Sequence, residues 1–375
     1  MTASPLSAAK RVVVKIGSSL LVDEATGHVR RKWLDSLADD IATLKAHQTD
    51  VIVVTSGAIA VGRRPLGFKP GPLRLDEKQA AAAAGQIRLA HAYQDSLARH
   101  DIVAAQILLT LDDSENRQRY LNARTTLMTL MAQGAVPVIN ENDTVATQEI
   151  RFGDNDRLAA RVAEMVGADA LVLFSDIDGL YSADPRKSAD ASFLGEIREI
   201  TPEIEAMAGS VGSSLGSGGM VTKLMAARIA MGAGCRMAIA LGDRLNPLSA
   251  IEKGGRCTWF LPSSEPRQAR KSWIAGSLSV AGTLTLDDGA AQALSKGRSL
   301  LPAGVAGVDG SFQKGDCVAF ADRQGRILGR GLVAYSADEA RRIAGHQSGE
   351  IEAILGYCGK DELVHRDDMA LEQIA

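Results

Sequence analysis

The chain has 375 residues, of which 46% are hydrophobic and 23% are charged, and its formal net charge is −3. These values are ordinary for a globular protein, and the length favours two domains over one. The nearly balanced charge gives no electrostatic reason for tight binding to nucleic acid. No hydrophobic run approaches the roughly 18 residues that a membrane span needs, and no secretory signal opens the chain. We therefore expect a cytoplasmic protein without membrane association, with a short disordered tail over residues 1–10.

The cysteine pattern argues against a disulfide framework or a metal cluster. The four cysteines lie far apart and form no C-x-x-C pair: Cys235, Cys257, Cys317 and Cys358. Metal sites and small disulfide scaffolds need closer and more regular spacing. We expect scattered thiols, mostly buried, in a reducing compartment.

The first 265 residues alternate between β-branched hydrophobic runs and stretches with helical spacing. The predicted strands are residues 11–17, 50–57, 101–110, 135–140, 169–176, 235–242 and 257–262. The predicted helices between them are residues 31–46, 77–99, 119–134, 156–167 and 221–234. Continuous hydrophobic strands separated by helices are typical of a mostly parallel sheet that is covered on both faces. Residues 11–265 are therefore predicted to form an α/β domain, a three-layer α/β/α sandwich with an open sheet.

The character of the chain changes near residue 265. Residues 266–280 are polar at first and begin with Pro266, which indicates a linker. The remainder, residues 281–375, consists of short strands broken by Gly and Asp turns, with a predicted hairpin whose turn is at Gln324 and Gly325. We expect a small β-rich C-terminal domain there.

Ligands of an open parallel sheet bind beyond the carboxyl ends of its strands. Lys15 stands at the end of the first predicted strand and is followed by Gly17 and two serines, a composition that suits a phosphate-binding nest. By itself, a lysine in this position can equally extend from the sheet edge to solvent. Ser56, after the second strand, can bind a ligand or cap the following helix, and the sequence leaves both roles open.

The strongest of these signals is "GSGGMVTK", residues 216–223. Its glycines free the backbone to present N–H groups, and a predicted helix begins directly after them, an arrangement that favours bound phosphate. The spacing differs from that of the P-loop. A mobile Gly/Ser linker is the alternative, but Lys223 directly after the glycines favours a phosphate site.

Two groups of Asn and Asp flank residues 144–152, for which we predict a hairpin. Asn142 and Asp143 precede this segment, and Asn155 and Asp156 follow it, so that both groups fall at the edge of the sheet that carries Lys15. Short amide and carboxylate side chains there can bind a small polar substrate, but they can also make turns and start a helix. The sheet alone does not distinguish these roles.

Five segments in order resemble the successive motifs of the glutamate 5-kinase family, within the amino acid kinase superfamily. They are "VVVKIGSSLL", "VTSGAIAVG", "VPVINENDTVATQEIRFGDND", "LFSDIDGLYSADPR" and "GSGGMVTKLMAARIA". The remainder of the chain is similar in character to the PUA domain that many bacterial members append. The resemblance implies an ATP-dependent kinase that phosphorylates the side-chain carboxylate of L-glutamate to L-glutamyl 5-phosphate, the first step of proline biosynthesis, under feedback inhibition by proline.

The resemblance also implies site residues. It assigns catalysis to Lys15 and Lys223, with Asp156 orienting the two lysines, and glutamate binding to Ser56, Asp143 and Asn155. The ATP-binding residues that it implies are Lys15, Gly17, Ser175, Asp176, Ser217, Gly218, Gly219, Met220, Val221, Thr222 and Lys223. It assigns no protein ligand to Mg²⁺, which is expected on the ATP phosphates. A homo-oligomer, dimer or tetramer, is also expected.

Two alternatives remain at this point. The chain can be another kinase of the superfamily, acting on acetylglutamate, aspartate, carbamate or UMP, although the "GDND" motif and the C-terminal domain favour glutamate. It can also be an RNA-binding protein that acts through its PUA-like domain. The balanced charge and the lack of a basic and aromatic cluster in that domain weigh against RNA binding.

Overall fold

The computed structural model describes residue 6 and residues 9–145, 154–188, 190–208, 219–276 and 279–372. It divides into two compact units, residues 1–266 and residues 267–375. Each unit has a hydrophobic core of its own.

The first unit is built on an eight-stranded sheet with the order β3-β4-β2-β1-β5-β9-β10-β8. Its strands are β1 (Arg11–Ile16), β2 (Asp50–Thr55), β3 (Ala104–Leu109), β4 (Val136–Glu141), β5 (Ala170–Ser175), β8 (Glu196–Ile197), β9 (Arg236–Leu241) and β10 (Cys257–Phe260). All neighbouring strands run parallel except β9 and β10, which are antiparallel. The prediction of an open, mostly parallel sheet is confirmed.

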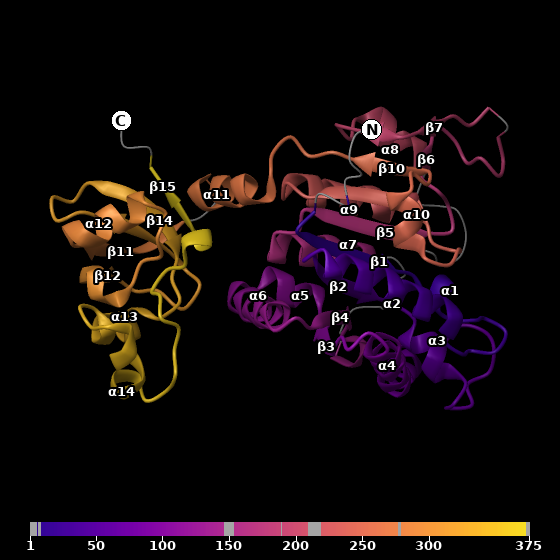
Figure 1. The fold of residues 1–375 in the computed structure, drawn as a ribbon, viewed down its shortest axis with the longest axis horizontal. Helices are drawn as coiled ribbons and strands as arrows, with labels where there is room; N and C mark the ends of the chain where they lie inside the picture. The colour runs from indigo at the N-terminus through magenta and orange to yellow at the C-terminus, as the bar shows by residue number, and fades with distance from the viewer. Residues whose placement is uncertain are drawn as a thin grey trace. The chain divides into compact units, whose positions relative to one another are not determined.

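Helices cover both faces of this sheet (Figure 1). The helices of the unit are α1 (Ser18–Leu21), α2 (Arg31–Ala46), α3 (Ala58–Arg63), α4 (Leu75–Ala98), α5 (Leu111–Glu115), α6 (Arg117–Ala132), α7 (Asp154–Val166), α8 (Pro202–Met207), α9 (Met220–Gly232) and α10 (Pro247–Glu252). A 3-10 turn η1 (Asp143–Val145) follows β4, and a small ribbon pairs β6 (Leu180–Tyr181) with β7 (Phe193–Leu194).

Alternation along β1 explains the three layers. Val12 and Val14 pack in the cluster that includes α2 and α4, whereas Val13 packs in the opposite cluster with α7 and α9. Successive side chains of a strand point to opposite faces, so a run of valines supplies both cores at once. This is why the strands of the first unit read as continuous hydrophobic segments.

The second unit contains a five-stranded sheet with the order β12-β11-β13-β14-β15. Its elements are α11 (Pro266–Gly276, which begins one residue before the unit), β11 (Val280–Leu286), α12 (Asp288–Ser295), η2 (Pro302–Gly304), β12 (Val305–Gly310), β13 (Cys317–Ala321), β14 (Ile327–Leu332), α13 (Ala337–Ile343), η3 (Ser348–Glu350), α14 (Ile351–Leu355), η4 (Arg366–Asp368) and β15 (Met369–Leu371). The predicted hairpin is present as the antiparallel pair β13–β14, and Gly325 in its turn has φ of 81°.

Two segments differ in the structure from what the sequence predicts. Within the expected disordered tail, residues 1–5, 7 and 8 lie outside the described residues, whereas the hydrophobic side chains of Leu6 and Ala9 are buried in a core cluster of the first unit. Within the expected linker 266–280, residues 266–276 form the helix α11. The predicted hairpin over residues 144–152 lies almost entirely outside the described residues, which end at Val145 and resume at Asp154. No helix of the described part of the chain combines the length and hydrophobicity that crossing a bilayer requires.

Candidate active site

The strand order of the first unit reverses beside β1. The chain places β2, β4 and β3 on one side of β1, and then places β5 and β9 on the other side. In an open parallel sheet the loops diverge at such a point and leave a crevice at the carboxyl ends of the strands. Lys15 near the end of β1 and Ser175 at the end of β5 both lie there.

The carboxylate of Asp156 forms ion pairs with both lysines of the predicted site. Lys15 Nζ lies 2.6 Å from Asp156 Oδ1, and Lys223 Nζ lies 3.3 Å from Asp156 Oδ2. The three residues come from β1, from the first turn of α7 and from the first turn of α9. All three are buried, so the alternative in which Lys15 extends to solvent is wrong. The cluster carries two positive charges against one negative charge, and such an excess suits an anionic ligand.

The ionisation of Asp156 follows from this arrangement. Burial raises the pKa of the Asp156 carboxyl, but the charges of Lys15 and Lys223 outweigh that effect, and Thr222 adds a hydrogen bond to Oδ2 at 3.1 Å. The pKa therefore lies below its ordinary value. A carboxylate that stays ionised between two ammonium groups fixes their positions without neutralising both of them.

Only part of the predicted phosphate loop is described. Ser217 and Gly218 lie outside the described residues, and Gly219 is the N-cap of α9. Met220, Val221 and Thr222 form the first turn of that helix. The Thr222 N–H donates to the carbonyl oxygen of Gly219 at 3.1 Å. The first backbone N–H groups of a helix have no acceptor one full turn earlier in the helix, so the start of α9, beside Lys223, is a suitable place for an anion.

Ser56 has a partner far away in the sequence. Asn155 Nδ2 donates to Ser56 Oγ at 2.7 Å and to the carbonyl oxygen of Thr55 at 3.0 Å. The N-cap of α3 is Gly57, with φ of 105°, and no side chain caps this helix. The alternative in which the Ser56 hydroxyl caps the helix is therefore wrong, since the left-handed glycine begins the helix one residue later and leaves that hydroxyl with Asn155.

The other predicted substrate residue, Asp143, is buried at the start of η1. It follows β4 by two residues, as Ser56 follows β2 by one. Because β2 and β4 are neighbouring parallel strands, both residues lie at the same edge of the sheet.

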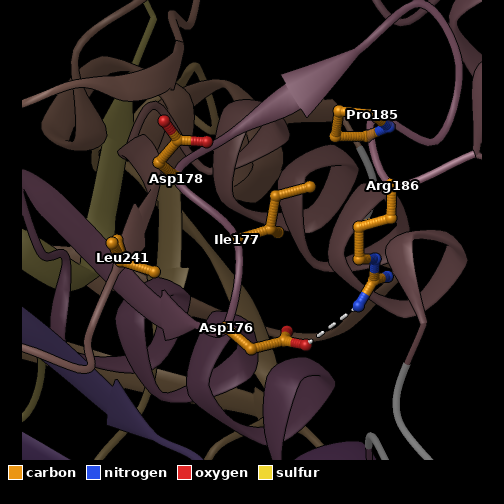
Figure 2. A pocket seen from close by; sticks show the side chains of 6 residues that line it. All are labelled: Asp176, Ile177, Asp178, Pro185, Arg186 and Leu241. Carbon is orange, nitrogen blue, oxygen red and sulfur yellow. Dashed lines mark ion pairs between the residues drawn. The ribbon is translucent and has the colours of Figure 1, made fainter. Parts of the chain in front are cut away.

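On the other side of β1, Asp176 lines a pocket of about 240 Å³, and Ser175 directly precedes that residue in the chain. Ser175 is buried, and its Oγ donates to Asp176 Oδ1 at 3.1 Å. Figure 2 shows Asp176 pointing toward Arg186, with 3.6 Å between Oδ2 and Nη1. The pocket is lined by Asp176, Ile177, Asp178, Pro185, Arg186 and Leu241. No individual role was predicted for the last five. Four of them lie in the quoted segment "LFSDIDGLYSADPR", and Leu241 is the last residue of β9.

The chain matches two family models. The amino acid kinase family model matches residues 10–240, and the PUA domain model matches residues 282–355. The first match covers the eight-stranded unit up to β9, and the second covers most of the five-stranded unit.

Similar proteins extend over nearly the whole chain. A glutamate 5-kinase of Paramagnetospirillum magneticum is 71% identical over 369 residues, which cover 98% of this chain and 100% of that protein. A glutamate 5-kinase of Rhodospirillum rubrum is 61% identical over 360 residues, 96% of either chain. Among solved structures, a carbamate kinase from Giardia lamblia bound to AMP-PNP covers 68% of this chain and 100% of its own at 17% identity, with a TM-score of 0.49.

Proposed function

We propose that this chain, which belongs to the glutamate 5-kinase family of the amino acid kinases, transfers the γ-phosphoryl group of ATP to the side-chain carboxylate of L-glutamate. The products are ADP and L-glutamyl 5-phosphate, an acyl phosphate. The observation that carries the proposal is the buried group of Lys15, Asp156 and Lys223 at the point where the strand order reverses.

The chemistry requires no general base. The side-chain carboxylate of free glutamate has an ordinary pKa of about 4.3 and is ionised near neutral pH. One of its oxygens attacks the γ-phosphorus, a new P–O bond forms, and the bond to the β-phosphate oxygen breaks as ADP leaves. The site must align the two anions and stabilise the charge on the transferring group.

Lys15 and Lys223 are positioned for this stabilisation. Their ammonium groups flank one carboxylate, 2.6 Å and 3.3 Å from its two oxygens, so Asp156 sets the distance between them. Groups held in place before the reaction need no reorganisation when charge develops, which is the main source of electrostatic catalysis. Backbone N–H groups at the start of α9 and at Gly17 supplement the lysines. We assign Asp156 the role of positioning residue.

We assign the glutamate side of the crevice to Ser56, Asp143 and Asn155, and the nucleotide side to Ser175, Asp176 and residues 217–223. The pocket beside Asp176 supports this division, because it lies across β1 from Ser56. Among the described residues, no group of three or more His, Cys, Asp or Glu side chains is placed to hold a metal. Both oxygens of the buried Asp156 are already engaged with lysines. We propose that Mg²⁺ enters on the phosphates of ATP.

Three further parts of the proposal depend on family membership alone. The reaction begins proline biosynthesis, proline inhibits it at the glutamate pocket, and the chain forms a homo-oligomer. A proline titration at several glutamate concentrations and sedimentation velocity test the last two.

A coupled ADP-release assay over a panel of acceptors tests the proposed function. Turnover should require ATP and L-glutamate. Turnover with acetylglutamate, aspartate, carbamate or UMP, and none with glutamate, would replace the proposal by another kinase of the superfamily. RNA retention that weakens with salt, in a protein without kinase activity, would favour an RNA-binding role.

A further inference from the structure

Three amide side chains form a chain of hydrogen bonds that ends at the proposed glutamate pocket. Asn140 Nδ2 donates to Gln86 Oε1 at 2.7 Å, and Asn155 Nδ2 donates to Asn140 Oδ1 at 3.1 Å. Gln86 belongs to α4, Asn140 lies near the end of β4, and Asn155 lies in the first turn of α7. Three separate elements are thereby joined, and Asn155 connects them to Ser56.

The direction of this chain is fixed by a backbone group. The carbonyl oxygen of Thr55 can only accept, so the side of the Asn155 amide that faces it at 3.0 Å must be Nδ2. Asn140 therefore accepts from Asn155 through its oxygen and presents its own Nδ2 to the next residue. Gln86 Oε1 is the acceptor that completes the sequence.

The direction of these hydrogen bonds leaves Asn155 Oδ1 as an acceptor with a fixed orientation. Asn155 Oδ1 is buried and has no hydrogen-bond partner among the described residues. A buried amide oxygen without a partner is energetically unfavourable, because it has lost its hydrogen bonds to water. A ligand that brings a donor to this oxygen recovers that cost. In L-glutamate the one cationic donor is the α-ammonium group.

We propose that Gln86 is a positioning residue that holds Asn155 Oδ1 toward the α-ammonium group of the substrate. The inference depends on the proposed function, since it concerns how glutamate is recognised. Gln86 itself does not touch the substrate. It accepts from Asn140, which prevents the Asn140 amide from turning over. The Asn140 oxygen then stays facing Asn155 Nδ2 and adds to the two acceptors, Thr55 O and Ser56 Oγ, that orient the Asn155 amide.

The backbone at Gln86 is held rigidly enough for this role. Its neighbour Gly85 packs so closely on α3 that a Cβ atom there would lie 1.8 Å from the carbonyl oxygen of Ala58. Ala58 is the first residue of α3 and follows Ser56 by two positions. Gln86 is therefore fixed relative to the end of β2, where the Asn155 amide is bound.

Two substitutions of Gln86 test whether this chain of amide hydrogen bonds orients Asn155. Gln86→Met keeps the length of the side chain and removes the acceptor, and Gln86→Ala removes the side chain. Each should raise KM for L-glutamate about tenfold, as expected for one lost hydrogen bond to a charged group, with kcat and KM for ATP within about twofold. Gln86→Glu retains an acceptor, so its KM for L-glutamate should remain near that of the unsubstituted protein. Gln94→Met, on an exposed position of α4, is the matched control and should change nothing.

Glutarate, which is glutamate without its ammonium group, identifies the atom involved. Its inhibition constant against L-glutamate should be the same in all variants, because it offers no donor to Asn155 Oδ1. Equal weakening of glutarate and glutamate would overturn the proposal, as would an unchanged KM for glutamate in both the Met and the Ala variants. If the unsubstituted protein turns over a different acceptor and not glutamate, the proposed function is wrong. That result is seen before any variant is compared.

Discussion

At the scale of single residues, the site depends on how Asp156 divides its two oxygens. Oδ1 binds Lys15 and Oδ2 binds Lys223, and each ammonium group comes from a different element. Removing one lysine leaves the carboxylate paired with the other, whereas removing the carboxylate takes one ion pair from each of two buried lysines. Substitution of a lysine should therefore mainly reduce kcat, whereas substitution of Asp156 should also reduce the stability of the protein.

Lys223→Met should fold normally and lose kcat by a hundredfold or more, the order expected for one electrostatic group acting on the transition state. KM for glutamate and ATP should change much less, because the charge matters most during transfer. Steady-state kinetics and thermal unfolding on one preparation measure both effects. Lys253→Met, an exposed lysine just after α10, is the control. A stable Lys223→Met variant with nearly normal kcat would contradict the assigned role.

Asp156→Asn should destabilise the protein by about 3–5 kcal/mol, because it removes the buried carboxylate that forms ion pairs with both Lys15 and Lys223. The pKa of Asp156 is lowered in the folded state from an ordinary value of 3.8. Its contribution to stability is therefore complete above about pH 5, falls as the pH drops below 3.8, and is lost below the folded pKa. Denaturant unfolding of both proteins from pH 8 to pH 3 measures this. The difference in unfolding free energy should be constant down to about pH 5 and shrink below 3.8. A difference that grows on acidification would show that the pKa is raised.

At the scale of elements, the close packing of α3 against α4 positions the residues of the proposed glutamate pocket. A Cβ atom on Gly62 would lie 1.9 Å from the carbonyl oxygen of Ala81, so only glycine allows the two helices to approach this closely. Farther along α4, Tyr93 is buried and its hydroxyl donates to Thr55 Oγ1 at 2.9 Å. The long helix thus contacts the residue before Ser56 and, through Gln86, the amide chain.

Gly62→Ala should destabilise the protein by about 1–3 kcal/mol, because the extra methyl group must push two backbones apart. It should also raise KM for glutamate, since the displaced α3 begins directly after Ser56 and Gly57. Gly232→Ala is the matched control, a glycine of α9 with nothing within 4 Å of the added atom. Better helix propensity should leave that variant unchanged or stabilised by up to about 1 kcal/mol. Urea unfolding compares the two, and a Gly62→Ala variant as stable as Gly232→Ala would refute the packing argument.

At the scale of the whole molecule, the described residues with proposed catalytic or binding roles all belong to the first unit. The second unit has its own core around Phe312, Phe320 and Tyr335, and an internal ion pair of 2.7 Å between Arg270 and Asp368. Units with separate cores usually fold independently. We propose that the kinase domain spans residues 11–265 and that the C-terminal domain spans residues 281–375.

A protein ending at Pro266 should fold and retain ATP turnover with L-glutamate. This end point retains residues 265 and 266, which pack against Gly234 of the first unit, and removes α11, whose Arg270 pairs within the second unit. Circular dichroism and the ADP-release assay test the expectation. Complete loss of turnover in a folded truncated protein would show that the second unit contributes to the reaction, whereas a change in proline sensitivity alone would not.

Sequence periodicity alone determined the main architecture of the first unit. The hydrophobic runs at residues 11–17 and 169–176 identified strands with both faces buried, and the ends of those strands indicated where we expect ligands to bind. This information is local, since a strand or helix shows its buried face in its own residues. The motif order added the family, because five spaced segments are far more specific than one.

Only the tertiary structure decided the roles of individual polar groups. Ser56 has the same local sequence whether it caps a helix or binds Asn155, 99 residues away. Gln86 lies in an alanine-rich helix that gives no sign of chemistry, and its importance arises from Asn140, 54 residues later. Hydrogen bonds require positions within about 3 Å and a defined donor and acceptor. Sequence spacing cannot supply either until helices and strands have packed together.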